Sequence, residues 1–509
     1  MPASHSKARS AAELPRASLR LASYTGSSIV SKSLPNGNGS GCYPHSEHSP
    51  SMGSATAQAP SRNEPRDDRD SWLTGHSMTQ LQALLPLTRA DVTWVGSLAG
   101  EIFEELRSRT CSERGVTRAS WGDGETVAAT ILKNHANALG LSTSSDAVGN
   151  LYVELPGRDP NAKSWITGSH LDSVPEGGNY DGAAGAIAGL LALAILKRTN
   201  CQPIRNVCVI GFRGEEASSW FTGHHQNHLG SRAALGVIRE RELDEAIHRQ
   251  SGLSLRDHLL RSGFQLPSDQ PVEVLQPNRI HGFVELHIEQ GPVLVTENLP
   301  VGIVSSIRGS LRIRDAKVIG EYGHSGAVPH YLRKDAVFAA ADFAGRCEGL
   351  AEEVRSAGGN LDITLGQFST DSKTHSLTKV SGEVRFSVDA RSSSDETLEL
   401  CRRNFADNAA RVATARGVDI QLGAFAKSEP AIMSPWLMSI IEESAKRLDI
   451  SAMTLPSGAG HDAAEFARLG VPAAMIFVRN DKGSHNPDES MEIADFIDGV
   501  LILVNVLFQ

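Results

Sequence analysis

Short apolar runs, each ending in polar residues, recur along most of this chain, and helix-like stretches separate them. They are SWIT, NVCVIGF, GFVEL, MTL and PAAMIFV, at residues 164–167, 206–212, 282–286, 453–455 and 472–478. Alternating strands, polar loops and helices predict a mostly parallel sheet covered by helices on both faces. Such sheets carry their sites beyond the carboxyl ends of the strands. We therefore predict an α/β chain with its chemistry at that edge.

A second region interrupts this pattern. Residues 301–424 have the order strand, helix, strand, strand, helix, strand, which is that of a self-contained α+β unit. The strand-end pattern resumes after it. With 509 residues the chain is too long for one ordinary core. We therefore predict a catalytic domain at 79–300 and 425–509, interrupted by an inserted α+β domain at 301–424.

The first 78 residues are rich in Ser, Pro and Gly and have no sustained apolar period, so we predict a disordered tail. The first 40 or so are also poor in acids, as organelle transit peptides are, but we favour a dispensable tail or a misassigned start codon. No secretory signal is recognisable. The six cysteines include no CxxC pair, which favours a reducing, cytoplasmic location.

The charge and the apolar runs exclude some partners. The formal net charge of −10 disfavours nucleic acid and anionic membranes, since both attract concentrated basic surfaces. Residues 183–196 form the longest apolar stretch, which is too short to span a bilayer and is expected to be a buried helix. A small molecule is the expected partner.

Metal-type ligands cluster in four polar segments near the expected strand ends. They are His170 with Asp181, the pair Glu215-Glu216, His287, and His485. Each alone has an ordinary explanation, such as a structural histidine, a solvated acidic face or an Asp-Gly turn. Their convergence on one sheet edge instead predicts two metal ions bridged by a carboxylate, with open positions for water and substrate. Adjacent residues point differently, so one Glu of the pair would bind metal and the other would take a proton.

Five segments carry a family resemblance: GSHLDSVPEGGNYDG, ELHIEQGPVL, GHSGAVPHYLRKDA, PSGAGHDAAEFA and SHNPDE. They resemble the N-carbamoyl-L-amino-acid hydrolase, allantoate amidohydrolase and β-ureidopropionase family, a branch of the dinuclear-metal aminoacylase and carboxypeptidase group. The match runs in order from about residue 80 to 505. It implies a peptidase-like catalytic domain and an inserted lid and dimerisation domain, hence a homodimer.

The resemblance also implies roles for individual residues. The metal ligands would be His170, Asp181, Glu216, His287 and His485, with Asp181 as the bridge and Glu215 as the general base. His170 and His287 would share one ion, and Glu216 and His485 the other. Asp172 would orient His170, as metal-bound imidazoles require. The two divalent ions would be Zn²⁺ or Mn²⁺, with Co²⁺ and Ni²⁺ also suited to such ligands.

Substrate contacts follow from the same resemblance. Gln290 would meet the carbamoyl end, and Arg391 would hold the substrate carboxylate. His324 would stabilise the oxyanion from the partner subunit. His461 would lie near the site, either against the substrate or packed behind the ligands.

Several positions depart from the family pattern. Thr378 replaces an Asn that helps to hold the substrate carboxylate, and Ser381 and Ser310 replace a Pro and a Gln. Residues 218–220 replace a segment that carries an Arg. We interpret the His-rich residues 222–228 as a solvated loop rather than a further metal site.

These observations predict a metal-dependent amidohydrolase acting on N-carbamoyl amino acids or related ureido acids such as allantoate and β-ureidopropionate. His287 favours this branch, because peptidases of the wider group tend to have a carboxylate there. A dipeptidase or N-acyl-amino-acid amidase is the alternative. A third interpretation is an inactive binding protein, against which the retained Glu215 argues.

Overall fold

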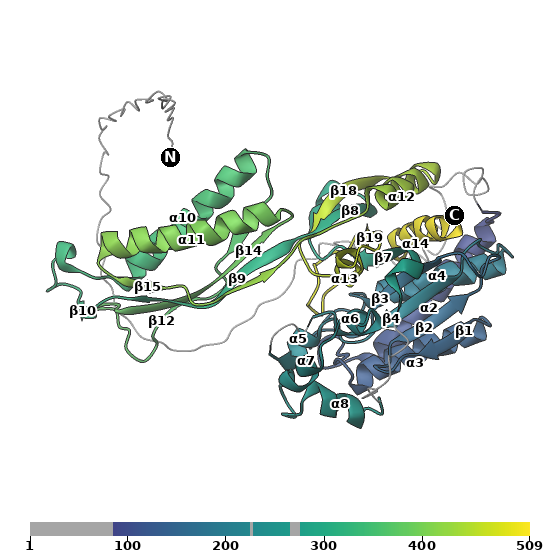
Figure 1. Ribbon diagram of the computed structural model, residues 1–509, viewed down its shortest axis with the longest axis horizontal. Helices are drawn as coiled ribbons and strands as arrows, with labels where there is room; N and C mark the ends of the chain where they lie inside the picture. The colour runs from purple at the N-terminus through teal and green to yellow at the C-terminus, as the bar shows by residue number, and fades with distance from the viewer. Residues whose placement is uncertain (1–84, 224–226, 265–274) are drawn as a thin grey trace, which may run out of the picture. The chain divides into compact units, whose positions relative to one another are not determined.

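The computed structural model describes residues 85–223, 227–264 and 275–509 (Figure 1). The expected tail at 1–78 lies outside the described residues. None of the described helices is long and apolar enough to cross a membrane.

The larger sheet has nine strands in the order β1-β2-β4-β3-β7-β19-β8-β17, with β18 paired to β8. Its strands are β1 (Ser142–Ser145), β2 (Leu151–Leu155), β3 (Ser164–His170), β4 (Val207–Phe212), β7 (Ile280–Ile288), β8 (Val301–Ile307), β17 (Ala431–Ile432), β18 (Ala452–Ser457) and β19 (Ala473–Val478). The central strands β4, β3, β7 and β19 run parallel to one another. The predicted mostly parallel sheet is confirmed, and the carboxyl ends of its central strands lie at one edge.

Alternating residues of the central strands build two separate cores. In β19, Ala474, Ile476 and Val478 join the core with one set of helices, whereas Ala473, Met475 and Phe477 join the opposite core. The first set is α2 (Arg89–Thr110), α3 (Asp123–Ala138), α4 (Ala183–Arg198), α12 (Pro435–Arg447) and α14 (Ile493–Phe508), and the second includes α6 (Leu229–Ala234) and α13 (Ala463–Arg468). The two-residue period of a strand therefore gives the sheet helices on both faces.

Helix α4 crosses the middle of the first core. Its residues 183–196 are all buried, so the expected buried helix is confirmed. The helix is Ala- and Gly-rich because strands pack closely against it: a Cβ at Gly185 would lie 2.1 Å from the carbonyl oxygen of Leu286 in β7.

A second sheet of six strands has the order β11-β14-β9-β15, with β12 paired to β14 and β16 to β9. Its strands are β9 (Gly309–Ile319), β11 (Asp362–Thr364), β12 (Phe368–Thr370), β14 (Glu383–Ser392), β15 (Asp419–Gln421) and β16 (Phe425–Ser428). Helices α10 (Ala336–Ser356) and α11 (Asp395–Arg416) lie side by side along it in Figure 1 and share its core. Side chains of Asp335 and Ser394 cap the two helices.

The expected strand and helix order of the inserted region is present, from β9 to β16. The expected domain limit at 301 falls at the start of β8, a strand of the nine-stranded sheet, and β16 extends the six-stranded sheet beyond 424. A two-stranded sheet of β10 (Gly323–His324) and β13 (Lys379–Val380) adds to this region. The division into domains stays a prediction.

Candidate metal centre

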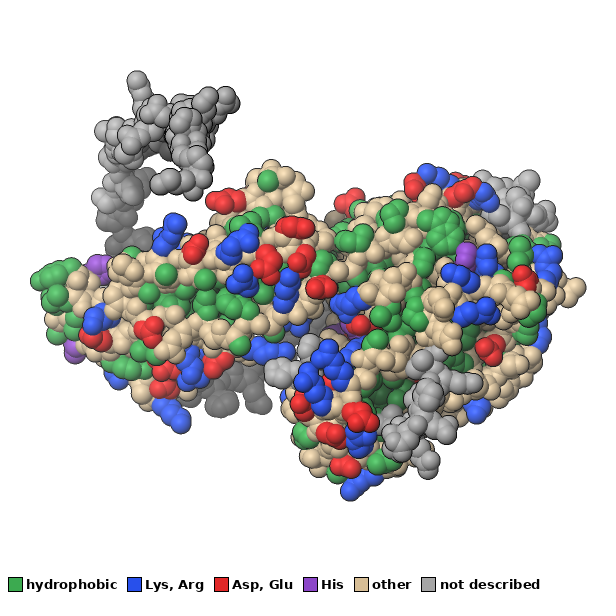
Figure 2. All heavy atoms as spheres, in the orientation of Figure 1, with side chains coloured by type: hydrophobic (Ala, Val, Ile, Leu, Met, Phe, Trp, Pro, Cys, Tyr) green, Lys and Arg blue, Asp and Glu red, His purple; other side chains and the backbone are tan. Residues whose placement is uncertain are grey.

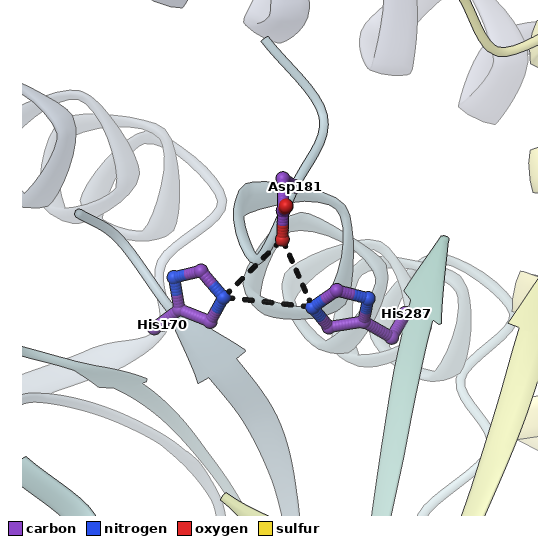
Figure 3. A group of neighbouring side chains, drawn as sticks. All are labelled: His170, Asp181 and His287. Atoms are coloured by element: carbon purple, nitrogen blue, oxygen red, sulfur yellow. Dashed lines mark hydrogen bonds and ion pairs between the residues drawn. The ribbon is translucent and has the colours of Figure 1, made fainter. Parts of the chain in front are cut away.

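His170, His287 and Asp181 meet at the carboxyl edge of the nine-stranded sheet (Figure 3). His170 is the last residue of β3, His287 lies one residue before the end of the adjacent β7, and Asp181 precedes α4. The Asp181 Oδ1 atom is 3.5 Å from His170 Nε2 and 3.2 Å from His287 Nε2. The two Nε2 atoms are 3.5 Å apart.

The other oxygen of Asp181 faces a second pair. Its Oδ2 atom is 3.5 Å from His485 Nε2, which itself lies 2.6 Å from Glu216 Oε1. Glu216 follows β4, and His485 lies in the loop after β19. Among the described residues, these two trios are two of the three groups that could hold a metal ion.

The donor set fits two divalent ions. Each trio offers imidazole nitrogen and carboxylate oxygen, and Asp181 presents one oxygen to each trio. Asp181 Oδ1 is buried and has no hydrogen-bond partner within the described residues. Buried polar atoms ordinarily have a partner, so a bridging position between two ions would satisfy this oxygen.

Gly182 makes room for the first trio. Its φ is +68°, and a Cβ there would lie 2.3 Å from the ring of His170. Both the backbone conformation and the close approach require glycine. The Asp-Gly pair is therefore more than an ordinary turn.

Contacts across the cluster favour the ionised form of Asp181. Burial opposes this, but the charged contacts with His170 and His287 hold the pKa of Asp181 well below its usual range. Burial likewise opposes protonation of His170, yet hydrogen bonds to Asp172 and Asp181 raise its pKa well above the usual value. The contact with Glu216 raises the pKa of His485 to about 9. A metal ion bound here would displace these protons and offset the charge of the carboxylates.

Asp172 is held at the centre of several contacts. Its Oδ1 lies 3.4 Å from His170 Nδ1, and its two oxygens accept the backbone N–H groups of Glu215 and Glu216 at 3.1 and 3.0 Å. Ser120 Oγ donates to it at 2.5 Å. Asp172 therefore ties the loop after β3 to the loop after β4.

Glu215 contacts His228, a residue that the sequence did not identify as part of the site. Its Oε1 atom lies 2.9 Å from Nε2 of His228, a residue only 6% exposed. The interpretation of residues 222–228 as a solvated loop is therefore wrong for His228, while 224–226 lie outside the described residues. Burial disfavours a charged imidazole, but Glu215 and Glu465 raise the pKa of His228 to about 10. Burial also opposes ionisation of Glu215, yet His228 lowers the pKa of this carboxyl.

Glu489 and Arg118 also lie at the site, although the sequence did not predict either of them as a site residue. Glu489 Oε1 accepts the backbone N–H groups of Tyr180 and Asp181 at 2.6 and 3.2 Å. Burial and the charge of Asp181 raise the pKa of Glu489 to about 7. Arg118, fully buried, donates to the carbonyls of Leu171 and Asp181. The SHNPDE motif contains Glu489 and was a usable signal; for Arg118 we find none.

Two of the expected substrate residues lie against the candidate ligands. Gln290 Nε2 donates to Asp181 Oδ2 at 3.0 Å. His461 is 1% exposed, and its ring packs edge-on to His287 with centroids 4.5 Å apart. Its Nε2 lies 2.8 Å from Ser457 Oγ. Of the two interpretations left open for His461, this burial favours packing behind the ligands.

Three others belong to the region of the six-stranded sheet. Arg391, in β14, bonds Asp389 Oδ2 through Nε and Nη2, and its Nη1 donates to the carbonyl of Gly458, three residues before His461. His324 and Thr378 are exposed. The Nδ1 atom of His324 accepts the backbone N–H groups of Gly326 and Ala327 at 3.1 and 3.2 Å. This ring nitrogen is therefore unprotonated, which leaves the hydrogen on Nε2.

The side chains at three positions that depart from the family pattern form hydrogen bonds with other residues of the chain. Ser310 Oγ lies 2.9 Å from Ser428 Oγ, and Ser381 Oγ donates to the carbonyl of Glu383. Trp220 is buried and donates its indole N–H to the carbonyl of Ser173, within the loop between His170 and Asp181.

Comparisons with known proteins agree with the expected family. Residues 166–509 match Peptidase family M20/M25/M40. The chain is 31% identical to N-carbamoyl-L-amino-acid amidohydrolase of Paenarthrobacter aurescens, over 80% of this chain and 97% of that protein. It is 32% identical to allantoate amidohydrolase of Escherichia coli strain K12, over 74% of this chain and 88% of that one.

A solved structure resembles it as well. The hydantoinase/carbamoylase family amidase from Burkholderia ambifaria superposes with a TM-score of 0.73 at 27% identity, covering 85% of this chain and 98% of the other. The family resemblance and fold class expected from the sequence are thus confirmed. The chain belongs to the peptidase M20/M25/M40 family, in its branch of N-carbamoyl-L-amino-acid and allantoate amidohydrolases.

Proposed function

We propose that this chain is a metal-dependent amidohydrolase that cleaves the C–N bond of an N-carbamoyl amino acid or a related ureido acid. One water is consumed, and ammonia, carbon dioxide and the free amine are released. One observation carries the proposal: Asp181 directs Oδ1 at His170 and His287 and Oδ2 at His485. This is the placement that a carboxylate shared by two ions needs.

His170 and His287 would hold one ion, Glu216 and His485 the other, and Asp181 both. When bound, two divalent ions acidify a water and polarise the scissile carbonyl. Zn²⁺ and Mn²⁺ suit these nitrogen and oxygen donors, and Co²⁺ or Ni²⁺ would also bind.

Glu215 would act as the general base. It is buried beside the ligand Glu216, and Asp172 fixes the backbone of both. Its carboxylate would take a proton from the attacking water and deliver it to the leaving nitrogen. Asp172 would also fix the orientation of His170 through the Nδ1 contact.

The substrate would be held by groups from both sheets. Arg391 is partly exposed and would pair with the substrate carboxylate, close to Thr378 in the bound state, while Gln290 would meet the carbamoyl group. His324 would donate from Nε2 to the developing oxyanion. We assign His461 to packing behind His287.

His324 would act across a homodimer formed through the inserted region. Large apolar side chains near it support this assembly: Tyr331 is 83% exposed and Leu377 99% exposed. Figure 2 shows hydrophobic side chains gathered at the end of this region, where Figure 1 places β10. Large exposed apolar groups commonly mark interfaces.

A substrate panel with purified protein tests the function. Metal content would be measured first, and ammonia release would then be followed from N-carbamoyl amino acids, allantoate and β-ureidopropionate, with dipeptides and N-acyl amino acids alongside. Glu215→Gln should lower kcat by at least about 100-fold while the metals stay bound. Cleavage of dipeptides alone would overturn the substrate class, and an unchanged kcat in Glu215→Gln would overturn its role as the base. Metal-loaded wild-type protein that turns over none of these compounds would indicate a binding protein.

A further inference from the structure

His228 is a buried imidazole between two carboxylates. Its Nε2 lies 2.9 Å from Glu215 Oε1, and its Nδ1 lies 2.8 Å from Glu465 Oε1. Glu465 is in turn paired with Arg468, one turn further along α13. A continuous chain of charged contacts therefore runs from Arg468 through Glu465 and His228 to the carboxylate of Glu215.

The backbone of His228 is adapted to this position. Its φ and ψ are 55° and 35°, a left-handed conformation that is uncommon for residues with a Cβ, although Asn, Asp and His adopt it more often than others do. The backbone N–H of His228 donates to the carbonyl of Glu215 at 3.2 Å, and Ser231 Oγ donates to the carbonyl of His228. These bonds fix the main chain that carries the imidazole, while the contacts with Glu215 and Glu465 fix the ring.

The neighbouring loop leaves space for the ring. A Cβ at Gly460 would lie 2.9 Å from His228 Nε2. Gly460 directly precedes His461, which packs on the candidate ligand His287. The imidazole therefore fills a gap that opens beside the metal centre.

We propose that His228 is a positioning residue that holds the Glu215 carboxylate in its working orientation, and that Glu465 fixes the imidazole for this task. The proposal rests on the proposed function, in which Glu215 is the general base. Glutamate has three rotatable side-chain bonds, and the carboxylates of Asp181 and Glu216 repel that of Glu215. A fixed imidazole on one oxygen removes that freedom and leaves the other oxygen for the water.

The central variant is His228→Asn, because asparagine tolerates the left-handed backbone. It should lower kcat by about 10- to 100-fold, the effect of a misplaced catalytic group, with little change in KM. Metal content should stay close to that of the wild type, while Tm should fall, because two buried carboxylates lose their shared partner. The matched control is His248→Asn, at another buried histidine that contacts Ser251 and Phe221 instead of the site; kcat should not change.

A double-mutant cycle tests the role of Glu465. Glu465→Gln should lower kcat less than His228→Asn does, since the imidazole remains. The double variant should be no slower than His228→Asn alone, because both changes act through one contact. Losses that multiply in the double variant would overturn the link between the two residues.

Failure of this proposal can be told apart from failure of the proposed function. The kcat ratio is measured on whichever C–N substrate the wild type cleaves, since a base serves ureido acids and peptides alike. Crystal structures of the Zn²⁺-loaded wild type and His228→Asn supply a readout without any substrate. A Glu215 carboxylate that moves in the variant supports the proposal. An unmoved carboxylate, an unchanged kcat or a loss explained by missing metal overturns it.

Discussion

The carboxylate of Asp172 accepts the backbone N–H of Glu216 at 3.0 Å. Together with the bond from the Glu215 N–H, it joins the loop after β3 to the loop after β4. The same carboxylate faces Nδ1 of His170. Asp172 thereby orients residues from both candidate metal trios, although it belongs to neither. A group in this position should control metal affinity.

We expect Asp172→Asn to weaken metal binding by about 10- to 100-fold, as loss of an outer partner of metal ligands does. The amide would present N–H where the carboxylate now accepts one. Titration of the metal-free protein against a fluorescent chelator measures the affinity. Asp315→Asn, an exposed acid of β9, is the control and should bind as the wild type does. An affinity equal to the wild type in Asp172→Asn would contradict the orienting role.

Gly182→Ala should abolish binding of at least one ion. The added Cβ would meet the His170 ring at 2.3 Å, in addition to the strain of an alanine at φ +68°. Gly358→Ala separates the two effects, because Gly358 has φ +81° and a Cβ added there would meet nothing within 4 Å. Both variants should lose some thermal stability, while only Gly182→Ala should lose metal in elemental analysis. Two full equivalents of metal in Gly182→Ala would be the contrary result.

The stability of the catalytic fold should respond to pH through Asp498 of α14. Burial and the charge of Asp495 raise the pKa of Asp498 from 3.8 to about 7. Folding therefore favours the protonated acid, and the stability that this gives is present at low pH and lost as the pH rises through about 7. Asp498→Asn should raise Tm above that of the wild type at about pH 8, with a smaller difference at about pH 5.

Asp495→Asn is the matched control on the same helix. Burial raises the pKa of Asp495 as well, but its pairing with Arg479 through both oxygens, at 2.7 and 3.1 Å, opposes the rise. Its replacement should therefore raise Tm at the higher pH less than Asp498→Asn does. If Asp498→Asn gave the same Tm shift at both pH values, burial of a charged Asp498 would not explain it.

The candidate ligands could be found from sequence because each follows a recognisable strand. His170 and His287 lie in the last two residues of their strands, Glu216 follows β4, and the parallel order of β4, β3 and β7 brings those ends together. The order of strands and helices in the inserted region was predicted from the sequence as well. These are local patterns whose spatial consequence is fixed by the fold class.

His228 and Glu489 could not be found in this way. His228 contacts Glu465, which is 237 residues away in the sequence. Glu489 accepts the backbone N–H of Asp181, which is 308 residues away. His228 lies in a polar stretch that contains two other histidines, and nothing in that stretch indicates that its side chain is buried. The sequence therefore suggests a solvated residue. Likewise the start of β8 at Val301 could not be separated from the inserted region, because only its pairing with β18 and β19 assigns it to the larger sheet.

Mixing two inactive variants should restore activity if His324 acts in the active site of the neighbouring subunit. Glu215→Gln lacks the base, and His324→Ala lacks the proposed oxyanion donor, so each homodimer should be nearly inactive. In a mixed dimer, one site combines an intact Glu215 with an intact His324 from the other chain. Mixing should restore up to about half of the wild-type kcat per mixed dimer, because one of its two sites is complete.

Glu215→Gln mixed with a chain carrying both substitutions has no complete site and should stay inactive. Isolated mixed dimers that recover nothing would place the action of His324 within its own chain.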